Sequence, residues 1–298
     1  MLLEPDAPNL VLLIGDPVEH TLSPHIQNAA FGAAGIPWVY APRRVSGERL
    51  EAVLEALRLL RLGGANITVP HKVAALRNMD ALDREARIVG AVNTVSVTEG
   101  GLRGSNTDVA GFSAALEETL PDGLTGEVAV VLGAGGAARA VVWALVRDGW
   151  AEHIGVVNRN LERGQVLINA IRDGQGRKGG SGVRFDLLQD AEALSPELKE
   201  RTGLIVNATP LGQGALSGES PLPDVEGFPE GTLVFDLVYA PAPTPLIQAA
   251  RSAGLPAIDG KEMLLHQGAR SFEIWTGERA PIDAMRDALR SALQRGEE

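Results

Sequence analysis

The stretch that decides the fold runs from Val128 to Ala138 and reads Val-Ala-Val-Val-Leu-Gly-Ala-Gly-Gly-Ala-Ala. An apolar strand leads into Gly133 and Gly135, and a helical pattern follows. Gly133 allows a tight turn, Gly135 lets backbone N–H groups approach a diphosphate, and the small Ala138 lets the helix pack close to the strand. This spacing predicts a Rossmann-like unit that binds a dinucleotide.

The residues after the next strand indicate which dinucleotide it is. An acidic residue about twenty positions after the glycines would accept hydrogen bonds from the adenosine ribose 2'-hydroxyl. Here the apolar residues 154–157 are followed by Asn158, Arg159 and Arg163. Charge-assisted hydrogen bonds contribute roughly 1.5 to 3 kcal/mol each, so two arginines on a 2'-phosphate favour NADP(H) by on the order of a hundredfold or more. The alternative is that both arginines are solvated residues at the start of a surface helix.

Composition excludes several other classes of protein. With 298 residues and 45% hydrophobic content, the chain is long enough for two α/β domains. The absence of cysteine excludes disulfides and thiolate chemistry, and the five histidines lack metal-site spacing, so we expect no metal. The net charge of −11 argues against nucleic acid or anionic membranes as partners. Without a leader or a long apolar run, a cytoplasmic location is expected.

Strands and helices alternate along the N-terminal third. Apolar stretches at 10–14, 38–41 and 65–69 predict strands, and the segments 24–34 and 47–62 between them predict helices. This order indicates a mostly parallel sheet, whose ligands bind beyond the carboxyl ends of the strands. In the second region we predict a helix at 108–120, strands at 128–132, 204–207 and 233–237, a surface loop at 174–182, and helix after Gly260.

Four polar clusters lie at predicted strand ends or loops. They are Thr21 with Ser23; Asn66, Thr68 and Lys72; Asn93; and Asn106 with Asp108. Hydroxyls, amides and one ammonium with one carboxylate suit a small, polyhydroxylated, anionic substrate. Each cluster taken alone has a structural alternative, such as a helix cap or a β-branched strand residue.

Taken together, the clusters form a series of motifs that resembles the shikimate dehydrogenase family. The motifs are Gly15-Asp-Pro-Val-Glu-His-Thr-Leu-Ser-Pro24, Asn66-Ile-Thr-Val-Pro-His-Lys72, Gly90-Ala-Val-Asn-Thr94, Asn106-Thr-Asp108, Gly133-Ala-Gly-Gly-Ala-Ala138, Asn158-Arg159, Asn207-Ala-Thr209, Asp236-Leu-Val-Tyr239 and Met263-Leu-Leu-His-Gln267. They occur in the family's order and cover nearly the whole chain.

This resemblance implies an NADPH-dependent, reversible reduction of 3-dehydroshikimate to shikimate in the route to chorismate and the aromatic amino acids. Lys72 matches the family's catalytic lysine, with Asp108 beside it, and an ammonium held by a carboxylate can give a proton to the alkoxide that hydride transfer leaves. The resemblance assigns the substrate carboxylate to Thr21, Ser23 and Tyr239. It assigns the ring hydroxyls to Asn66, Thr68, Asn93, Asp108 and Gln267.

The resemblance also implies where the cofactor lies and how the domains are built. It assigns the binding of the diphosphate to Gly133, Ala134, Gly135, Gly136 and Ala137. It assigns the binding of the adenosine phosphate to Asn158, Arg159 and Arg163. Thr209, Leu237 and Gly260 border the cofactor. The chain then divides into a substrate domain, residues 1–107 and 260–298, which is completed by C-terminal helices, and an NADP-binding domain, residues 108–259.

Two departures from the family pattern keep alternatives open. Thr21 stands where most members have serine, and its added methyl group reshapes the carboxylate end of the pocket. Asn160 replaces the threonine that usually follows the Asn-Arg pair, which removes one phosphate contact. One alternative is therefore a quinate or aminoshikimate dehydrogenase, with NADP or NAD. Another is a non-catalytic relative that binds NADP(H) or shikimate. The chain is expected to be a monomer or a homodimer.

Overall fold

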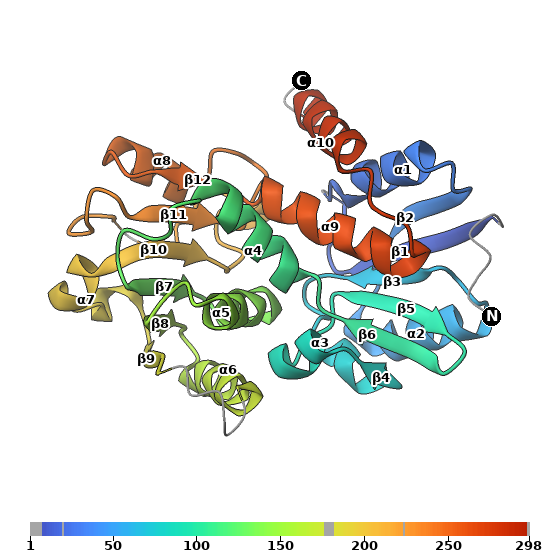
Figure 1. The fold of residues 1–298 in the computed structure, drawn as a ribbon, viewed down its shortest axis with the longest axis horizontal. Coiled ribbons are helices and arrows are strands. Elements are labelled where there is room, and N and C mark those ends of the chain that lie inside the picture. The colour runs from blue at the N-terminus through green and yellow to red at the C-terminus, as the bar shows by residue number, and fades with distance from the viewer. Residues whose placement is uncertain (1–7, 20, 176–181, 223, 297–298) are drawn as a thin grey trace. The chain divides into compact units, whose positions relative to one another are not determined.

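In the computed structural model, the chain divides into two compact units. The structure describes residues 8–19, 21–175, 182–222 and 224–296. One unit is Met1–Gly111 with Leu264–Glu298, and the other is Phe112–Met263 (Figure 1). The divisions fall inside helices α4 (Asp108–Thr119) and α9 (Lys261–Thr276), a little later than the 107/108 and 259/260 boundaries predicted from sequence.

The first unit is built on a six-stranded sheet in the order β2-β1-β3-β5-β6-β4. Its strands are β1 (Asn9–Gly15), β2 (Trp38–Arg44), β3 (Gly64–Ile67), β4 (Ala81–Leu82), β5 (Thr94–Thr98) and β6 (Gly101–Ser105). Its helices are α1 (Ser23–Ala33), η1 (Gly47–Arg49), α2 (Leu50–Leu59), η2 (Ala74–Asn78), α3 (Arg84–Val89) and α10 (Ile282–Gly296), together with most of α9.

The strand β1 explains why this sheet is covered on both faces. Val11 and Leu13 pack in a core with residues of α1, α9 and α10, whereas Leu12 and Ile14 pack in a second core with α2. Successive side chains of a strand point to opposite faces, so an uninterrupted apolar run predicts a strand buried on both sides. The C-terminal helices thus complete the N-terminal unit, as expected.

A hairpin that the sequence analysis did not identify makes this sheet mixed. β5 pairs antiparallel with β3 and with β6, while β1 pairs parallel with β2 and β3, and β4 pairs parallel with β6. The hairpin turn requires Gly101, which has a φ of +104° and whose Cβ would collide with the Asp80 carboxylate. The glycine pair at 100–101 between two short alternating stretches was the available signal.

The second unit has an entirely parallel sheet in the order β12-β11-β10-β7-β8-β9. Its strands are β7 (Val128–Leu132), β8 (His153–Val157), β9 (Arg184–Leu188), β10 (Thr202–Asn207), β11 (Leu233–Asp236) and β12 (Ala257–Ile258). This is the doubly wound order of the Rossmann fold, in which the chain reverses direction across the sheet between β7 and β10. The predicted fold class is confirmed.

Helices connect the parallel strands of the second unit. They are α5 (Gly136–Asp148), α6 (Leu161–Gly174), η3 (Ala191–Ala193), α7 (Pro196–Glu200), η4 (Gly214–Leu216) and α8 (Pro245–Ser252), together with most of α4. Val128, Val130 and Leu132 of β7 pack in one core with residues of α7 and α8. The predicted loop at 174–182 falls largely on residues 176–181, outside the described residues, and α6 itself continues through Gly174.

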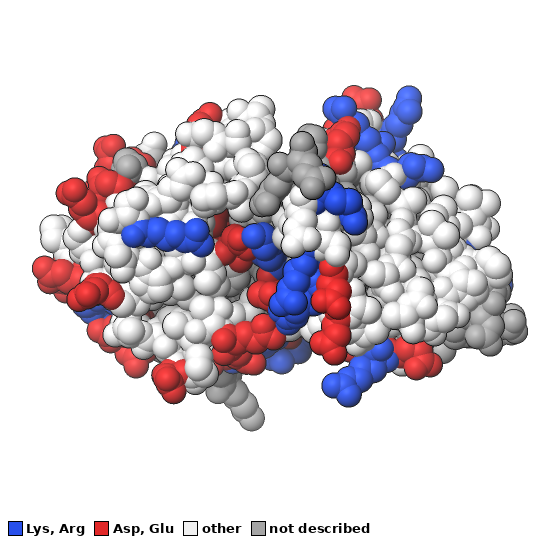
Figure 2. All heavy atoms as spheres, turned by 90° about the horizontal axis from the view of Figure 1, so that it is seen from above, with Lys and Arg blue, Asp and Glu red and all other residues white. Residues whose placement is uncertain are grey.

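The surface carries both signs of charge. On the face that Figure 2 draws, acidic and basic side chains are interspersed and form no broad basic area. Exposed ion pairs such as Arg270–Glu273 and Arg201–Glu127 agree with this mixing. Among the described residues, no helix combines the length and the apolar character needed to cross a membrane.

Candidate active site

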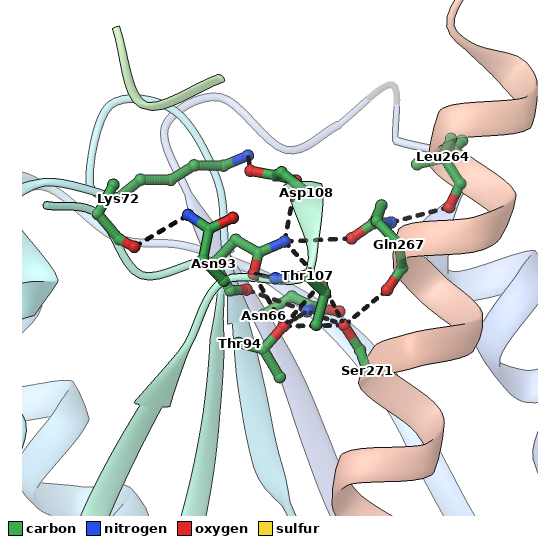
Figure 3. A network of polar contacts seen from close by, with 11 residues as sticks. Asn66, Lys72, Asn93, Thr94, Thr107, Asp108, Leu264, Gln267 and Ser271 are labelled. Carbon is green, nitrogen blue, oxygen red and sulfur yellow. Dashed lines mark hydrogen bonds and ion pairs between the residues drawn. The ribbon is translucent and has the colours of Figure 1, made fainter. Parts of the chain in front are cut away.

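A lysine and an aspartate form the centre of the candidate site in the first unit. Lys72 Nζ lies 2.6 Å from Asp108 Oδ2, and the two side chains are 15% and 5% exposed. Lys72 lies in the loop after β3, and the Val92 N–H fixes this loop by donating to the Lys72 carbonyl. Asp108 is the first residue of α4. A carboxylate is stabilised at a helix N-terminus, which favours an acidic residue there. The two residues that the sequence analysis expected side by side point toward each other (Figure 3).

Asn93 holds the other oxygen of this carboxylate. Its Nδ2 donates to Asp108 Oδ1 at 2.9 Å and to Thr107 Oγ1 at 2.8 Å, and it lies 3.4 Å from Gln267 Oε1. The Thr107 backbone N–H donates to Asn93 Oδ1 at 2.7 Å, which settles the orientation of the amide because a backbone N–H can only donate. Lys72, Asn93, Asp108 and Gln267 therefore converge at one place in the unit.

Beneath these residues lies a buried cluster of hydroxyls that the sequence analysis missed. We call Thr94, Thr107 and Ser271 the hydroxyl cluster; their oxygens lie 2.8 to 3.2 Å apart. Asn66 Nδ2 donates to two of them, and its Oδ1 accepts from the Tyr40 hydroxyl. Thr94 and Thr107 belong to the quoted motifs but received no role there, and Ser271 lies one helical turn after Gln267. Membership of a motif, or helical spacing from one, was therefore the signal that could have found them.

Thr21 and Ser23 lie together at the start of α1. Thr21 Oγ1 donates to Ser23 Oγ at 3.2 Å and accepts from Ser23 N–H at 3.3 Å. Ser23 is largely buried, and Thr68 and Thr21 are partly buried. Tyr239, which was assigned to the same carboxylate, belongs to the second unit in the segment after β11, and its assignment stays a prediction.

The second unit carries the cradle that its glycines predict. Gly133 follows β7 directly with a φ of +111°, and a Cβ there would lie 3.1 Å from the Ala208 carbonyl oxygen. Gly135 is the N-cap of α5 without a side-chain cap, and a Cβ there would have no heavy atom within 4 Å. Gly135 is exposed, so the start of α5 is open to a ligand, and a helix N-terminus suits a diphosphate. The residues present fit the dinucleotide, and the assignment of Gly133 to Ala137 to its diphosphate stays a prediction.

The two arginines expected at the 2'-phosphate follow β8. Arg159 and Arg163 are exposed, and among the described residues neither guanidinium has an ion-pair partner. Asn160 is the N-cap of α6, where its Oδ1 accepts from Arg163 N–H at 2.9 Å, and Asn158 Nδ2 donates to the Asn160 carbonyl. Asn160 therefore acts as a helix cap in this structure, which leaves both arginine side chains available for an anion.

Thr209, Leu237 and Gly260 lie just after the carboxyl ends of β10, β11 and β12, respectively. Thr209 Cγ2 is one of the atoms nearest a Cβ built on Gly133, so Thr209 adjoins the cradle at the point where the strand order reverses. Thr209 Oγ1 donates to Asn207 Oδ1 at 2.7 Å. Gly260 lies so close to the Leu237 carbonyl that a Cβ would collide with it. Contact with a cofactor stays a prediction for these three residues.

A buried carboxyl group lies behind this edge of the sheet. Asp236 is 0% exposed and accepts hydrogen bonds from Thr244 Oγ1, Val238 N–H and Asn207 Nδ2. Burial raises the pKa of Asp236 above its ordinary value of 3.8, and the nearby Asp259 charge adds to this rise. The three hydrogen bonds lower the pKa but do not reverse its direction. The folded chain therefore binds the Asp236 proton more tightly than the unfolded chain does.

This raised pKa predicts the pH dependence of one contribution to stability. The contribution is fully present below pH 3.8 and is lost as the pH rises through the folded pKa of Asp236, because the folded state must then carry a buried charge. Urea unfolding of the wild type and of Asp236→Asn across acidic pH measures it. The free energy of unfolding of the wild type relative to the variant should be greatest at the lowest pH. A difference that grows with pH would contradict this sign.

Comparison with known proteins agrees with this geometry. Residues 13–95 match the family model for the shikimate dehydrogenase substrate binding domain, and residues 260–290 match that for the shikimate 5'-dehydrogenase C-terminal domain. A relative from Methanopyrus kandleri named shikimate dehydrogenase (NADP(+)) is 41% identical over 286 residues, 96% of each chain.

Solved structures show the same similarity. Shikimate 5-dehydrogenase from Thermus thermophilus, solved with NADP(H) and shikimate, has a TM-score of 0.80 and 37% identity, covering 96% of this chain and 100% of that one. Quinate dehydrogenase from Corynebacterium glutamicum, solved with NAD, has a TM-score of 0.83 and 33% identity. The match again covers 96% of this chain and 100% of that one. The motifs, the fold and these relatives agree, and the chain belongs to the shikimate dehydrogenase family.

Proposed function

We propose that this chain is an NADP-dependent shikimate dehydrogenase, which reversibly reduces the ketone of 3-dehydroshikimate to the hydroxyl of shikimate on the route to chorismate and the aromatic amino acids. The observation that carries the proposal is the 2.6 Å pair between Lys72 Nζ and Asp108 Oδ2, which is nearly buried and is oriented by Asn93. A protein that only binds shikimate or NADP(H) has no need of a fixed proton donor of this kind.

Lys72 moves the proton in this mechanism. NADPH, when bound, supplies a hydride to the ketone carbon. The Lys72 ammonium stabilises the negative charge that develops on the ketone oxygen and donates the proton to it, directly or through one water. In the reverse direction, neutral Lys72 accepts the proton of the shikimate hydroxyl. Proton transfer of this kind needs no metal ion.

Asp108 and Asn93 keep the lysine in place. Asp108 holds the ammonium through Oδ2, and Asn93 Nδ2 holds Oδ1, so the carboxylate cannot rotate away without losing a charge-assisted hydrogen bond. Preorganised groups of this kind lower the barrier because they need no reorganisation during the reaction. Asp108 also accepts a hydrogen bond from a ring hydroxyl of the substrate.

The substrate is held by hydroxyl and amide groups of the first unit. The Thr21 and Ser23 hydroxyls, which already lie 3.2 Å apart, donate to the substrate carboxylate, and Tyr239 is the third residue assigned to it. Asn66, Thr68, Asn93 and Gln267 bind the ring hydroxyls. This set offers donors and acceptors to a neutral, hydroxylated ring and donors to a single anionic group.

A spectrophotometric assay of NADP⁺ reduction with shikimate tests the proposal. We expect saturable reduction that requires both compounds, and the reverse reaction with NADPH and 3-dehydroshikimate. Shikimate binding without reduction of NADP⁺ or NAD⁺ would instead identify a non-catalytic relative.

Quinate is the competing substrate that the observations favour. Thr21 stands where most of the family has serine, and the quinate dehydrogenase from Corynebacterium glutamicum shares this fold at 33% identity. We expect kcat/KM to be highest for shikimate with NADP⁺, because two arginines follow β8 where an acidic residue would bind the NAD ribose. Measuring kcat/KM for shikimate and quinate with each cofactor decides between them, and a higher value for quinate would correct the assignment.

A further inference from the structure

We infer that Ser271 is a positioning residue for substrate binding, which fixes α9 against the sheet so that Gln267 lies beside Asn93. The inference rests on the proposed function, since it concerns how the amides of that site are held. Ser271 itself is 0% exposed, so it cannot touch the substrate, and the motifs discussed above do not contain it.

Ser271 connects α9 to three other segments of the first unit. Its Oγ lies 3.0 Å from Asn66 Nδ2 on β3, 2.8 Å from Thr94 Oγ1 on β5, and 3.1 Å from Thr107 Oγ1 just before α4. It also donates to the Gln267 carbonyl of its own helix at 3.0 Å. Figure 3 shows Ser271 and Gln267 on the same side of α9, facing the strands. One hydroxyl thus joins the helix to the sheet.

The proton positions follow from the partners. Asn66 Nδ2 lies 3.0 Å from the Asn93 carbonyl, which can only accept, and Asn66 Oδ1 accepts from the Tyr40 hydroxyl. The NH₂ group of Asn66 therefore faces Ser271, and Ser271 Oγ accepts from it. The Ser271 proton is then free to donate to the Gln267 carbonyl. An alanine can neither accept nor donate here. Asn66 Nδ2 would keep the Asn93 carbonyl and Thr94 Oγ1 as acceptors, but the buried Thr94 and Thr107 hydroxyls would lose their 2.8 and 3.1 Å contacts with Ser271.

Ser271 affects the candidate site through Gln267. Gln267 precedes Ser271 by one helical turn, so both project from the same face of α9. Gln267 Oε1 lies 3.4 Å from Asn93 Nδ2, near the limit of a hydrogen bond, while its Nε2 donates to the Leu264 carbonyl at 2.9 Å. A small shift of α9 would therefore separate Gln267 from Asn93. Loss of Ser271 should weaken substrate binding although no ligand of the substrate is removed.

The test is steady-state kinetics of Ser271→Ala. Without the contacts of Ser271, α9 relaxes away from the sheet, and substrate binding must draw it back against the buried hydroxyls at a cost on the order of 1 to 2 kcal/mol, so we expect KM for shikimate to rise about 5- to 30-fold. We expect kcat to change by less than about threefold and KM for NADP⁺ to stay unchanged, because Lys72 and the cofactor residues are untouched. A general loss of stability would not raise KM for shikimate while leaving KM for NADP⁺ unchanged.

Thr276→Val is the matched control. Thr276 is also on α9, is largely buried, and donates to a carbonyl four residues earlier, that of Phe272, at 2.8 Å. It takes no part in the hydroxyl cluster. We expect its KM for shikimate to stay within about twofold of wild type. An equal rise of KM in both variants would reduce Ser271 to an ordinary structural residue of α9 and overturn the inference.

A double-mutant cycle with Gln267→Ala tests the route of the effect. If Ser271 acts through Gln267, the rise in KM that Ser271→Ala causes should largely vanish when Gln267 is already alanine. If Ser271→Ala raises KM for shikimate as much in the Gln267→Ala protein as in the wild type, the inference is overturned. Should Ser271→Ala fail to fold, Thr94→Val removes the other hydroxyl of the 2.8 Å contact and allows the same cycle.

Failure of the inference can be told apart from failure of the proposed function. Wild-type protein that oxidises shikimate, together with an unchanged KM in Ser271→Ala, overturns only the inference. Wild-type protein that neither oxidises nor binds shikimate overturns both.

Discussion

Replacing Lys72 with methionine should lower kcat for shikimate oxidation by about 10²- to 10⁴-fold, the usual contribution of one proton-transfer group, and should change KM little. Methionine keeps much of the length of the lysine stem but has no ammonium to hold at Asp108 Oδ2, 2.6 Å away in the wild type. The measurement is NADP⁺ reduction at saturating shikimate and NADP⁺, with binding of shikimate followed separately.

The matched control for this prediction is Lys199→Met. Lys199 lies on α7 in the second unit, where its Nζ lies over the Phe228 ring and donates to the Glu226 carbonyl. Its loss should leave turnover near wild type. A Lys72→Met protein that retains normal turnover would remove Lys72 from the mechanism and with it the main argument for catalysis.

The second large effect is expected at the arginines after β8. Replacing Arg159 and Arg163 together with alanine should raise KM for NADPH by roughly a hundredfold or more, because two charge-assisted hydrogen bonds to the 2'-phosphate are lost at roughly 1.5 to 3 kcal/mol each. KM for NADH, which has no such phosphate, should change little. Comparing kcat/KM for NADPH and NADH in wild type and variant measures the change in preference.

Arg251→Ala is the control for nonspecific loss of positive charge. Arg251 is an exposed residue on α8, away from the end of β8 in the sheet order, and its removal should leave the preference for NADPH intact. An unchanged preference in the Arg159 and Arg163 variant would show that the phosphate binds elsewhere. Because both side chains are exposed, we expect the variant to unfold at the same temperature as the wild type. That result would exclude a folding defect as the cause of a higher KM.

The sequence was sufficient for the parts of the fold that depend on local patterns. The apolar run of β7, the glycines after it and the alternation of strands and helices predicted the parallel Rossmann-like sheet. These features depend on residues close in the chain, such as a turn that needs Gly133 at a φ of +111°. The β5–β6 hairpin was missed because its strands lack a continuous apolar run: Ser96, Arg103 and Ser105 interrupt them.

The sequence by itself was also enough to predict which side chains bear the chemistry, because the family motifs pointed to Lys72, Asp108 and Asn93, and the residues after the second strand to the two arginines. Only the tertiary structure decided how they are held: that Asn93 orients the Asp108 carboxylate, that Asn160 caps α6, and that Ser271 joins α9 to β3 and β5. Ser271 and Asn66 are 205 residues apart in the chain. Their contact depends on how α9 packs on the sheet through its apolar face, and no local pattern in one sequence specifies that packing.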